Sequence, residues 1–175
     1  MKKLHLFLLS VLVVAATSCK KDKADDSIHL KCKVDGVEKT FNTSTTAGAS
    51  TEDGQSILAV FGSSAASESA EHLILYISKT GSAVTTGTYS VDGENYSVTG
   101  LYSTGTSGGV SYVGGNEINT SEASKALKIV ITQIDDKTVR GTFSGEFYED
   151  GDDSNPKKTI SEGSFYVNVT DQLPG

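Results

Sequence analysis

Residues 28–41 carry the clearest structural signal in the chain, Ile28-His29-Leu30-Lys31-Cys32-Lys33-Val34-Asp35-Gly36-Val37-Glu38-Lys39-Thr40-Phe41. Every second residue before Asp35-Gly36 is apolar, which is the period of a strand with one buried face. An Asp-Gly pair between two such runs indicates a two-residue type I′ turn, because both central positions need a positive φ. The stretch therefore predicts a β-hairpin.

This turn also fixes which residues of the two strands face each other. The expected pairs are Leu30–Phe41, Cys32–Lys39 and Val34–Val37 on the apolar side, and Lys33–Glu38 on the other. A Lys–Glu pair directly across two strands is favourable. Lys39 is the charged residue on the apolar side, and we expect its amine in water at the sheet margin. Cys32 should behave as a small buried hydrophobe.

Short apolar or alternating runs recur along the rest of the chain, separated by Gly, Ser, Thr, Asn and Asp. With the first hairpin they predict strands at 28–34, 37–41, 57–61, 73–77, 88–91, 96–102, 127–134, 139–148 and 164–169. Segments 42–55 and 62–71 have no apolar period and are expected to be loops, and 122–127 offers at most one helical turn. This pattern predicts an all-β domain, an antiparallel β-sandwich with a closed β-barrel as the alternative.

A second hairpin is expected around Asp135-Asp136-Lys137. A one-residue slip in register moves every side chain to the opposite face, so burial should select a three-residue loop or a bulge. Either choice puts one apolar set on one face: Leu127, Ile129, Ile131, Val139, Phe143 and Phe147. Gly141 and Gly145 lie on that same face, where they leave room for the opposite sheet or mark bends.

The first 26 residues differ in composition from the rest. Lys2 and Lys3 precede an apolar run of about thirteen residues, and Ala16-Thr17-Ser18 leads to Cys19. A membrane span needs about 17–25 residues, so the run predicts a cleaved signal. A cysteine after small residues is typical of lipoprotein processing, which joins a diacylglyceryl group to the Cys19 sulfur. Plain secretion and an uncleaved anchor are the alternatives.

The predicted organisation is a signal peptide at 1–18, a lipidated tether at 19–27 and a β-domain at 28–175. The tether is polar and charged, so we expect it to be disordered, with a reach of at most ~30 Å. Cys19-Lys20-Lys21-Asp22 with Asp25-Asp26 resembles the surface-export signal of Bacteroidota lipoproteins. We therefore expect a lipid anchor in the outer membrane, at the cell surface or on the periplasmic face. Asp26-Ser27-Ile28 resembles an O-glycosylation signal of the same phylum, which makes Ser27 a candidate site.

Charge excludes one class of partner. The chain has 15 Lys and Arg against 22 Asp and Glu, and removing residues 1–18 takes away two of the basic ones, for a mature net charge of −9. Binding to a nucleic acid duplex needs clustered Lys and Arg, and this chain has one arginine, Arg140. Broad docking on anionic lipid headgroups is disfavoured for the same reason.

Few residues are candidates for catalysis or metal binding. His29 and His72 remain after processing, and we expect both on the surface; no catalytic or phosphate-binding motif accompanies them. Asp150, Asp152 and Asp153 are a weak calcium hypothesis, because their spacing does not match the twelve-residue calcium loop. Calcium is therefore the one cofactor considered, and a solvated loop is the alternative.

Three tyrosines in a Gly/Ser/Thr-rich stretch, Tyr96, Tyr102 and Tyr112, are candidate ligand-binding residues, since Tyr with Ser and Gly is typical of adaptable recognition surfaces. The alternative is that their rings cover sheet edges.

Four segments carry a family resemblance: Cys32-Lys33-Val34-Asp35-Gly36, Gly87-Thr88-Tyr89, Val139-Arg140-Gly141-Thr142-Phe143-Ser144-Gly145 and Ile160-Ser161-Glu162-Gly163-Ser164-Phe165. In this order the chain resembles a family of uncharacterised Bacteroidota lipoproteins with a single β-rich domain. The resemblance implies a fold and an address, and it transfers no catalytic residue.

These observations favour a non-enzymatic binding or accessory module with a protein or glycan partner. The first alternative is a structural surface-coat or adhesion subunit that assembles through edge strands. A hydrolase comes third, since it would need acids clustered in a concave pocket.

Overall fold

The computed structural model describes residues 27–105, 109–116, 127–152 and 154–170, without the side chain of Glu52. The strands of this part are β1 (His29–Val34), β2 (Val37–Thr40), β3 (Thr43–Glu52), β4 (Gln55–Ser63), β5 (His72–Thr80), β6 (Gly87–Ser90), β7 (Tyr96–Ser103), β8 (Ser111–Gly115), β9 (Lys128–Ile134), β10 (Thr138–Glu149) and β11 (Lys157–Thr170). No helix occurs among these residues, and the predicted all-β class is confirmed.

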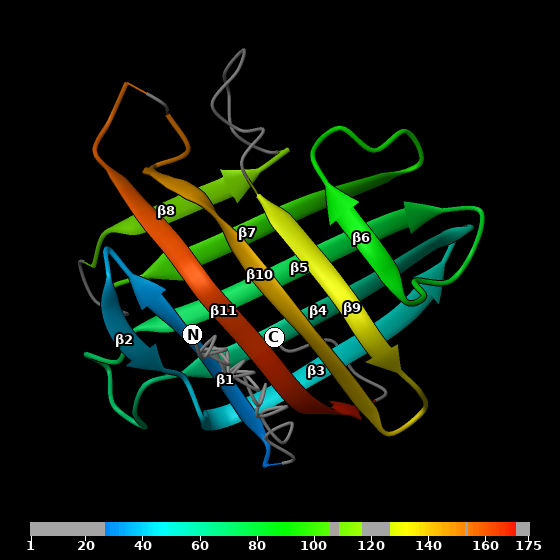
Figure 1. Cartoon of the computed structure of the whole chain (residues 1–175), viewed down its shortest axis with the longest axis horizontal. Helices are drawn as coiled ribbons and strands as arrows, with labels where there is room; N and C mark the ends of the chain where they lie inside the picture. The colour runs from blue at the N-terminus through cyan, green and yellow to red at the C-terminus, as the bar shows by residue number, and fades with distance from the viewer. Residues whose placement is uncertain (1–26, 106–108, 117–126, 153, 171–175) are drawn as a thin grey trace, which may run out of the picture.

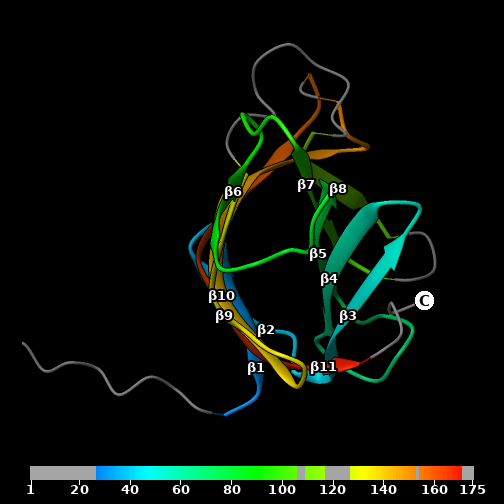
Figure 2. The same ribbon diagram turned by 90° about the vertical axis from the view of Figure 1, so that its right-hand side faces the viewer.

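The strands form two layers that pack face to face around one core (Figure 2). The first layer has the order β2-β1-β11-β10-β9-β6 and the second β3-β4-β5-β7-β8. The strands of one layer cross those of the other (Figure 1), as in orthogonal sheet packing.

Hydrogen bonding continues from one layer to the other at two corners. At one corner β10 pairs with β8 through Tyr148 and Glu149. At the other, β11 pairs with β3 in parallel through Val169 and Thr170. The sheet is therefore continuous and mixed, not two separate antiparallel sheets, because long strands such as β11 serve both layers.

The first hairpin has the predicted turn and register. Asp35 and Gly36 have φ values of 50° and 81°, as a type I′ turn requires. The pairs Val34–Val37, Lys33–Glu38 and Cys32–Lys39 are all present, and the N–H of Phe41 donates to the carbonyl oxygen of Leu30 at 2.8 Å. The Nζ of Lys33, however, makes its ion pair with Glu162 at 2.7 Å.

The second hairpin confirms the bulge. Val139 pairs with Ile134 next to the turn, and the register then shifts so that Gly141 faces Ile131 and Phe143 faces Ile129. The shift lies at Thr132, which is the extra residue of β9. Ile129, Ile131, Val139 and Phe143 are consequently all buried on one face.

The predicted loop at 42–55 is wrong, because Thr43–Glu52 is strand β3. Its apolar signal is weak, since its inward positions hold small residues such as Ala47. Asp53 and Gly54, with φ values of 49° and 77°, join β3 to β4 by the same turn chemistry as the first hairpin. Strand β8 was also missed. The loop expected at 62–71 is confirmed from Ser64 onward, and residues 122–126 lie outside the described part.

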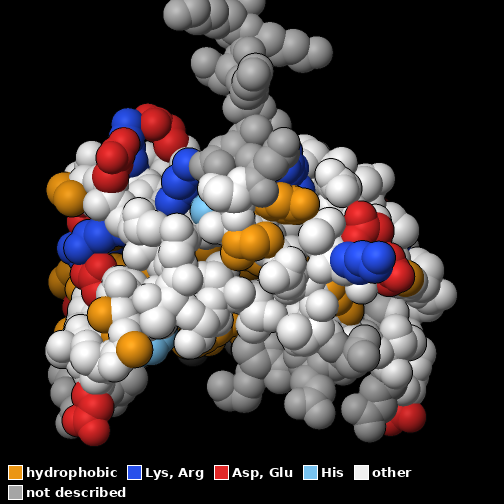
Figure 3. All heavy atoms as spheres, turned by 90° about the horizontal axis from the view of Figure 1, so that it is seen from below, with side chains coloured by type: hydrophobic (Ala, Val, Ile, Leu, Met, Phe, Trp, Pro, Cys, Tyr) orange, Lys and Arg blue, Asp and Glu red, His pale blue; other side chains and the backbone are white. Residues whose placement is uncertain are grey.

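The core lies between the layers and is closely packed. Its largest fully buried side chains include Phe41, Phe147, Phe165, Leu30 and Leu58. Viewed from below, hydrophobic side chains gather near the middle, while Asp and Glu side chains lie toward the sides (Figure 3).

Candidate functional site

The outer surface of the second layer is the most distinctive feature of the molecule. Leu58, Leu75 and Val98 point into the core, so their neighbours along each strand point outward. The strand register places these outward residues side by side. We call this surface the uncharged face, consisting of Thr46, Gly48, Ser50, Ile57, Ala59, Phe61, Ser63, His72, Ile74, Tyr76, Ser78, Ser97, Thr99, Leu101, Ser103, Ser111, Val113 and Gly115. None of these residues is Asp, Glu, Lys or Arg.

An apolar row crosses the uncharged face. Phe61 pairs with Ile74, Ile74 with Leu101, and Leu101 with Val113, so four large side chains lie on four adjacent strands. All four are partly exposed. Tyr76 and Ile57 lie on the same surface, two and four residue pairs from the row. Contiguous apolar surface of this kind marks interaction sites.

The outer surface of the first layer differs sharply. In β10 buried and more exposed residues alternate from Thr138 to Phe147, and the outward Arg140, Thr142, Ser144 and Glu146 are all polar. Charged residues extend over this surface: Lys31, Lys33, Lys128, Arg140, Glu146 and Glu162. The absence of charge is thus a property of one layer and not of the whole molecule.

Strands β4 and β5 show this property in their own sequences. Residues 57–61 and 73–77 are apolar at every position. Continuous apolar runs are typical of strands covered on both faces, whereas a half-solvated strand alternates. Here the core covers one side, and on the other side the large residues Ile57, Phe61, Ile74 and Tyr76 stay partly exposed.

The two histidines are placed differently from the prediction of exposed side chains. His29 is only 7% exposed, and its Nδ1 lies 2.8 Å from the carbonyl oxygen of Ser27, a residue that is itself exposed. His72 is half-buried at one end of the uncharged face, where its ring stacks on Phe61 with centroids 5.9 Å apart. Neither ring nitrogen of His72 has a hydrogen-bond partner among the described residues. The two histidines lie on different layers, β1 and β5, so each is a separate feature.

A hollow of about 430 Å³ lies beside His72. It lies between the strand ends and the loop that follows β4, and its lining residues are Ser44, Phe61, Ser63, Ala65, Ala66, Ser67, Glu68 and His72. This loop forms the rim of the uncharged face at that end, and Glu68 is the charged residue it contributes.

The candidate tyrosines do not form an exposed recognition surface. Tyr102 and Tyr112 are 2% and 8% exposed, and their ring centroids lie 6.0 Å apart inside the molecule. Tyr96 is half-buried and packs edge-on against Tyr89 at 5.0 Å. All three share the inward side of their strands with core residues such as Val98. The tyrosine on the uncharged face is Tyr76, which the apolar run of β5 contained without marking it as a site.

The acidic loop supplies no metal site among the described residues. Asp152 accepts hydrogen bonds from the N–H of Ser154 at 2.9 Å and from its hydroxyl at 2.7 Å, and these bonds lower the pKa of the Asp152 carboxyl. Asp150 occupies a turn with φ of 53°, and Asp153 lies outside the described part. Within the described ranges no three His, Cys, Asp or Glu residues are placed to hold a metal ion. The calcium hypothesis therefore gains no ligand set here.

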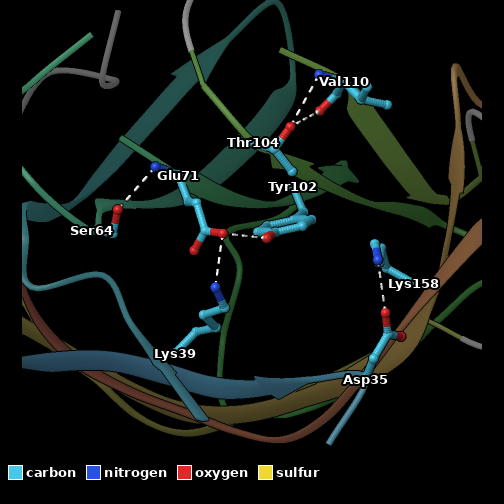
Figure 4. A network of polar contacts seen from close by, with 8 residues as sticks. All are labelled: Asp35, Lys39, Ser64, Glu71, Tyr102, Thr104, Val110 and Lys158. Atoms are coloured by element: carbon cyan, nitrogen blue, oxygen red, sulfur yellow. Dashed lines mark hydrogen bonds and ion pairs between the residues drawn. The ribbon is translucent and has the colours of Figure 1, made fainter. Parts of the chain in front are cut away.

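A polar network closes one open end between the layers (Figure 4). Lys39 on β2 forms an ion pair of 2.9 Å with Glu71, and the hydroxyl of Tyr102 donates to the same carboxylate oxygen at 3.0 Å. The amine of Lys39 was expected in water at the sheet margin, but it forms an ion pair with Glu71 on the side of the opposite layer. The ion pair thus links an edge strand of the first layer to the second.

This network does not activate a nucleophile. Burial, and after it the charge of the nearby Glu71 carboxylate, together raise the pKa of the Cys32 thiol to about 12. Burial, the hydrogen bond to Glu71 and its charge also raise the pKa of Tyr102. A thiol is nucleophilic as the thiolate, so Cys32 is inert at neutral pH. The prediction that Cys32 is a buried hydrophobe is confirmed by its 4% exposure.

The ion pair between Asp35 and Lys158 gives a prediction for stability in acid. Asp35 accepts from the Nζ of Lys158 and from the N–H of Thr159, both at 2.9 Å, and these bonds hold its pKa below the ordinary value of 3.8. Because the folded pKa is lowered, the stabilisation is complete above pH 3.8 and is lost as pH falls through the folded pKa. Asn tolerates a positive φ as Asp does, so Asp35→Asn removes the ion pair and keeps the turn. We expect this variant to lose about 0.5 kcal/mol of unfolding free energy at pH 7.

Urea unfolding at pH 7 and at acid pH checks this expectation. The difference between wild type and Asp35→Asn should shrink as the medium becomes more acid. Asp53→Asn is the matched control, because Asp53 occupies the equivalent turn position and has no ion pair in the described structure. A difference that persists unchanged in acid would contradict the role of the ion pair.

Comparisons with protein-family models, with curated proteins and with solved structures give no match for this chain. Among the described residues there is also no helix of the length and apolarity that crossing a membrane requires.

Proposed function

We propose that this chain is a lipid-anchored protein of the bacterial outer membrane that acts as a non-enzymatic binding module, with the uncharged face as its binding surface. The observation that carries the proposal is the uncharged face itself, with its apolar row of Phe61, Ile74, Leu101 and Val113. An acidic domain that keeps the central part of one sheet face free of charge, short of the Glu52–Gln55 pair at the end of β3 and β4, has a surface suited to burial against a partner.

The position of the tether supports this assignment. The order of residues around Cys19 is typical of lipoprotein processing, and the chain enters the domain at β1, in the first layer (Figure 1). The uncharged face belongs to the other layer (Figure 2). The chain therefore joins the domain on the layer opposite the uncharged face.

The edge strands argue against the structural-subunit alternative. In the described sheet the two free edges are β2 and β6, each of four residues. Lys39 points inward from β2 to Glu71. Short edges and inward-pointing charges are devices that prevent edge-to-edge pairing. A partner that docks on the sheet face fits the geometry better than one that adds a strand.

Photo-crosslinking in the intact envelope tests the binding surface. We would replace Tyr76 with p-benzoylphenylalanine, and Tyr166 in a matched control, because both tyrosines are partly exposed and point outward from opposite layers. We expect a crosslinked product from position 76 and none from position 166. Equal products from both positions, or none from position 76, would exclude the uncharged face as the binding surface.

The anchor has its own test. Cys19→Ser should abolish incorporation of radiolabelled palmitate and release the protein from the membrane fraction, because two or three acyl chains are what hold such a protein stably. Palmitate incorporation that survives this substitution would overturn the assignment of Cys19.

A further inference from the structure

We propose that the partner on the uncharged face is a second copy of this chain, in a two-fold dimer with the uncharged faces in contact. This inference rests on the proposed function and names its partner. A two-fold interface uses the same patch on both copies, so the patch must tolerate itself. The apolar row meets that requirement, because its residues carry no charge that would repel the same residues of the second copy. The row consists of Phe61, Ile74, Leu101 and Val113.

Charge selects this face over the others. Each mature chain carries a net charge of −9, so two copies repel in most orientations. The first layer would bring Lys31, Arg140 and Glu146 into the interface, where each charged group would lose its contact with water. Contact through the uncharged face buries none of these groups, and it keeps the charged outer surfaces of the two copies furthest apart.

The area is sufficient for a stable pair. Five strands at ~4.8 Å spacing, with about eight residues each on average at ~3.3 Å rise, give a surface of ~650 Å² per copy, or ~1,300 Å² for two. Stable interfaces bury ~1,200–2,000 Å² in total. In the dimer the outward side of β4 and β5 is covered as well. Continuous apolar runs are typical of strands that are covered on both faces.

The dimer is compatible with two anchors in one membrane. Strand β1 begins at the lower end of the domain, and the loop between β10 and β11 lies at the upper end (Figure 1). We place the two-fold axis in the plane of the uncharged face, running from the lower to the upper end of the domain. Rotation about this axis puts the β1 strands of both copies at the same end. The two first layers then lie outside, and both tethers leave toward one membrane.

Two measurements on the full lipidated protein test the dimer. The product crosslinked from position 76 should have twice the mass of the chain and contain only its own peptides. In detergent, sedimentation equilibrium should show a concentration-dependent dimer whose dissociation constant rises about 100-fold or more in Ile74→Asp, because a charge at the centre of the apolar row is buried unpaired. Thr142→Asp, on the outer surface of the first layer, should leave the dissociation constant unchanged.

The outcomes separate the two proposals. A product of doubled mass from position 76, together with loss of the dimer in Ile74→Asp alone, supports the dimer. A product that contains a different protein, with a monomer in sedimentation, overturns the dimer and leaves the binding surface in place. No product from position 76 overturns both. Circular dichroism of Ile74→Asp verifies its fold, and an equal loss of the dimer in Thr142→Asp would overturn the assignment to the uncharged face.

Discussion

Gly62→Ala is expected to lower the free energy of unfolding by about 3 kcal/mol or more, enough to unfold a domain of marginal stability. Gly62 lies on the inner side of β4, next to the connection between β2 and β3 and to Leu30 of β1. A Cβ at this position would lie 2.2 Å from the carbonyl oxygen of Phe41 and 2.8 Å from the Cδ2 of Leu30. The oxygen belongs to the backbone and cannot turn away, so the connection between β2 and β3 would have to move.

The measurement is urea unfolding followed by circular dichroism. Gly54→Ala provides the control, because Gly54 has a positive φ of 77° but no atom within 4 Å of the added Cβ. It should cost only about 1 kcal/mol, from backbone strain alone. If the two variants lost the same stability, steric contact between the layers would not be what requires glycine at position 62.

The hairpins could be predicted from sequence because their signals are local. Asp35-Gly36 needs no distant contact to set a type I′ turn, and the turn then fixes the register of its strands. Strand β3 could not be found by the same route, because its inward residues are small and its burial comes from β4 and β11. The Asp53-Gly54 turn was the local signal that marked its end. Lys39 was misplaced because its partner, Glu71, is 32 residues away on the other layer.

The sequence indicated only the part of the uncharged face that lies on β4 and β5. The apolar runs at 57–61 and 73–77 were interpreted only as strands, although continuous apolar runs are typical of strands covered on both faces. The row itself depends on register across four strands, and it includes Leu101 and Val113 from β7 and β8. The tyrosines chosen by composition lie on the inward side of the same strands. Which side a residue occupies changes with every step along a strand, so composition alone could not separate Tyr102 from Leu101.

The second large effect is expected at Phe147, where Phe147→Ala should cost about 3–5 kcal/mol of unfolding free energy. This side chain is fully buried, and its ring lies over two glycines of the opposite layer. A Cβ at Gly100 would lie 2.3 Å from the Cζ of Phe147, and one at Gly114 would lie 3.0 Å from its Cδ2. The ring thus fills space that only glycine leaves free, so its loss opens a cavity that small neighbours cannot fill.

A double-mutant cycle distinguishes this packing from a general requirement for glycine in β7. Gly100→Ala alone should cost about 1–3 kcal/mol, because the added methyl group overlaps the ring. In the Phe147→Ala background the same change should cost almost nothing, since the methyl group then enters the cavity, and the coupling should be about 2 kcal/mol. In a Phe165→Ala background, where the missing ring had covered Gly141 instead, Gly100→Ala should keep its full cost. Additive costs in the Phe147→Ala background would mean that the ring does not set the size limit at Gly100.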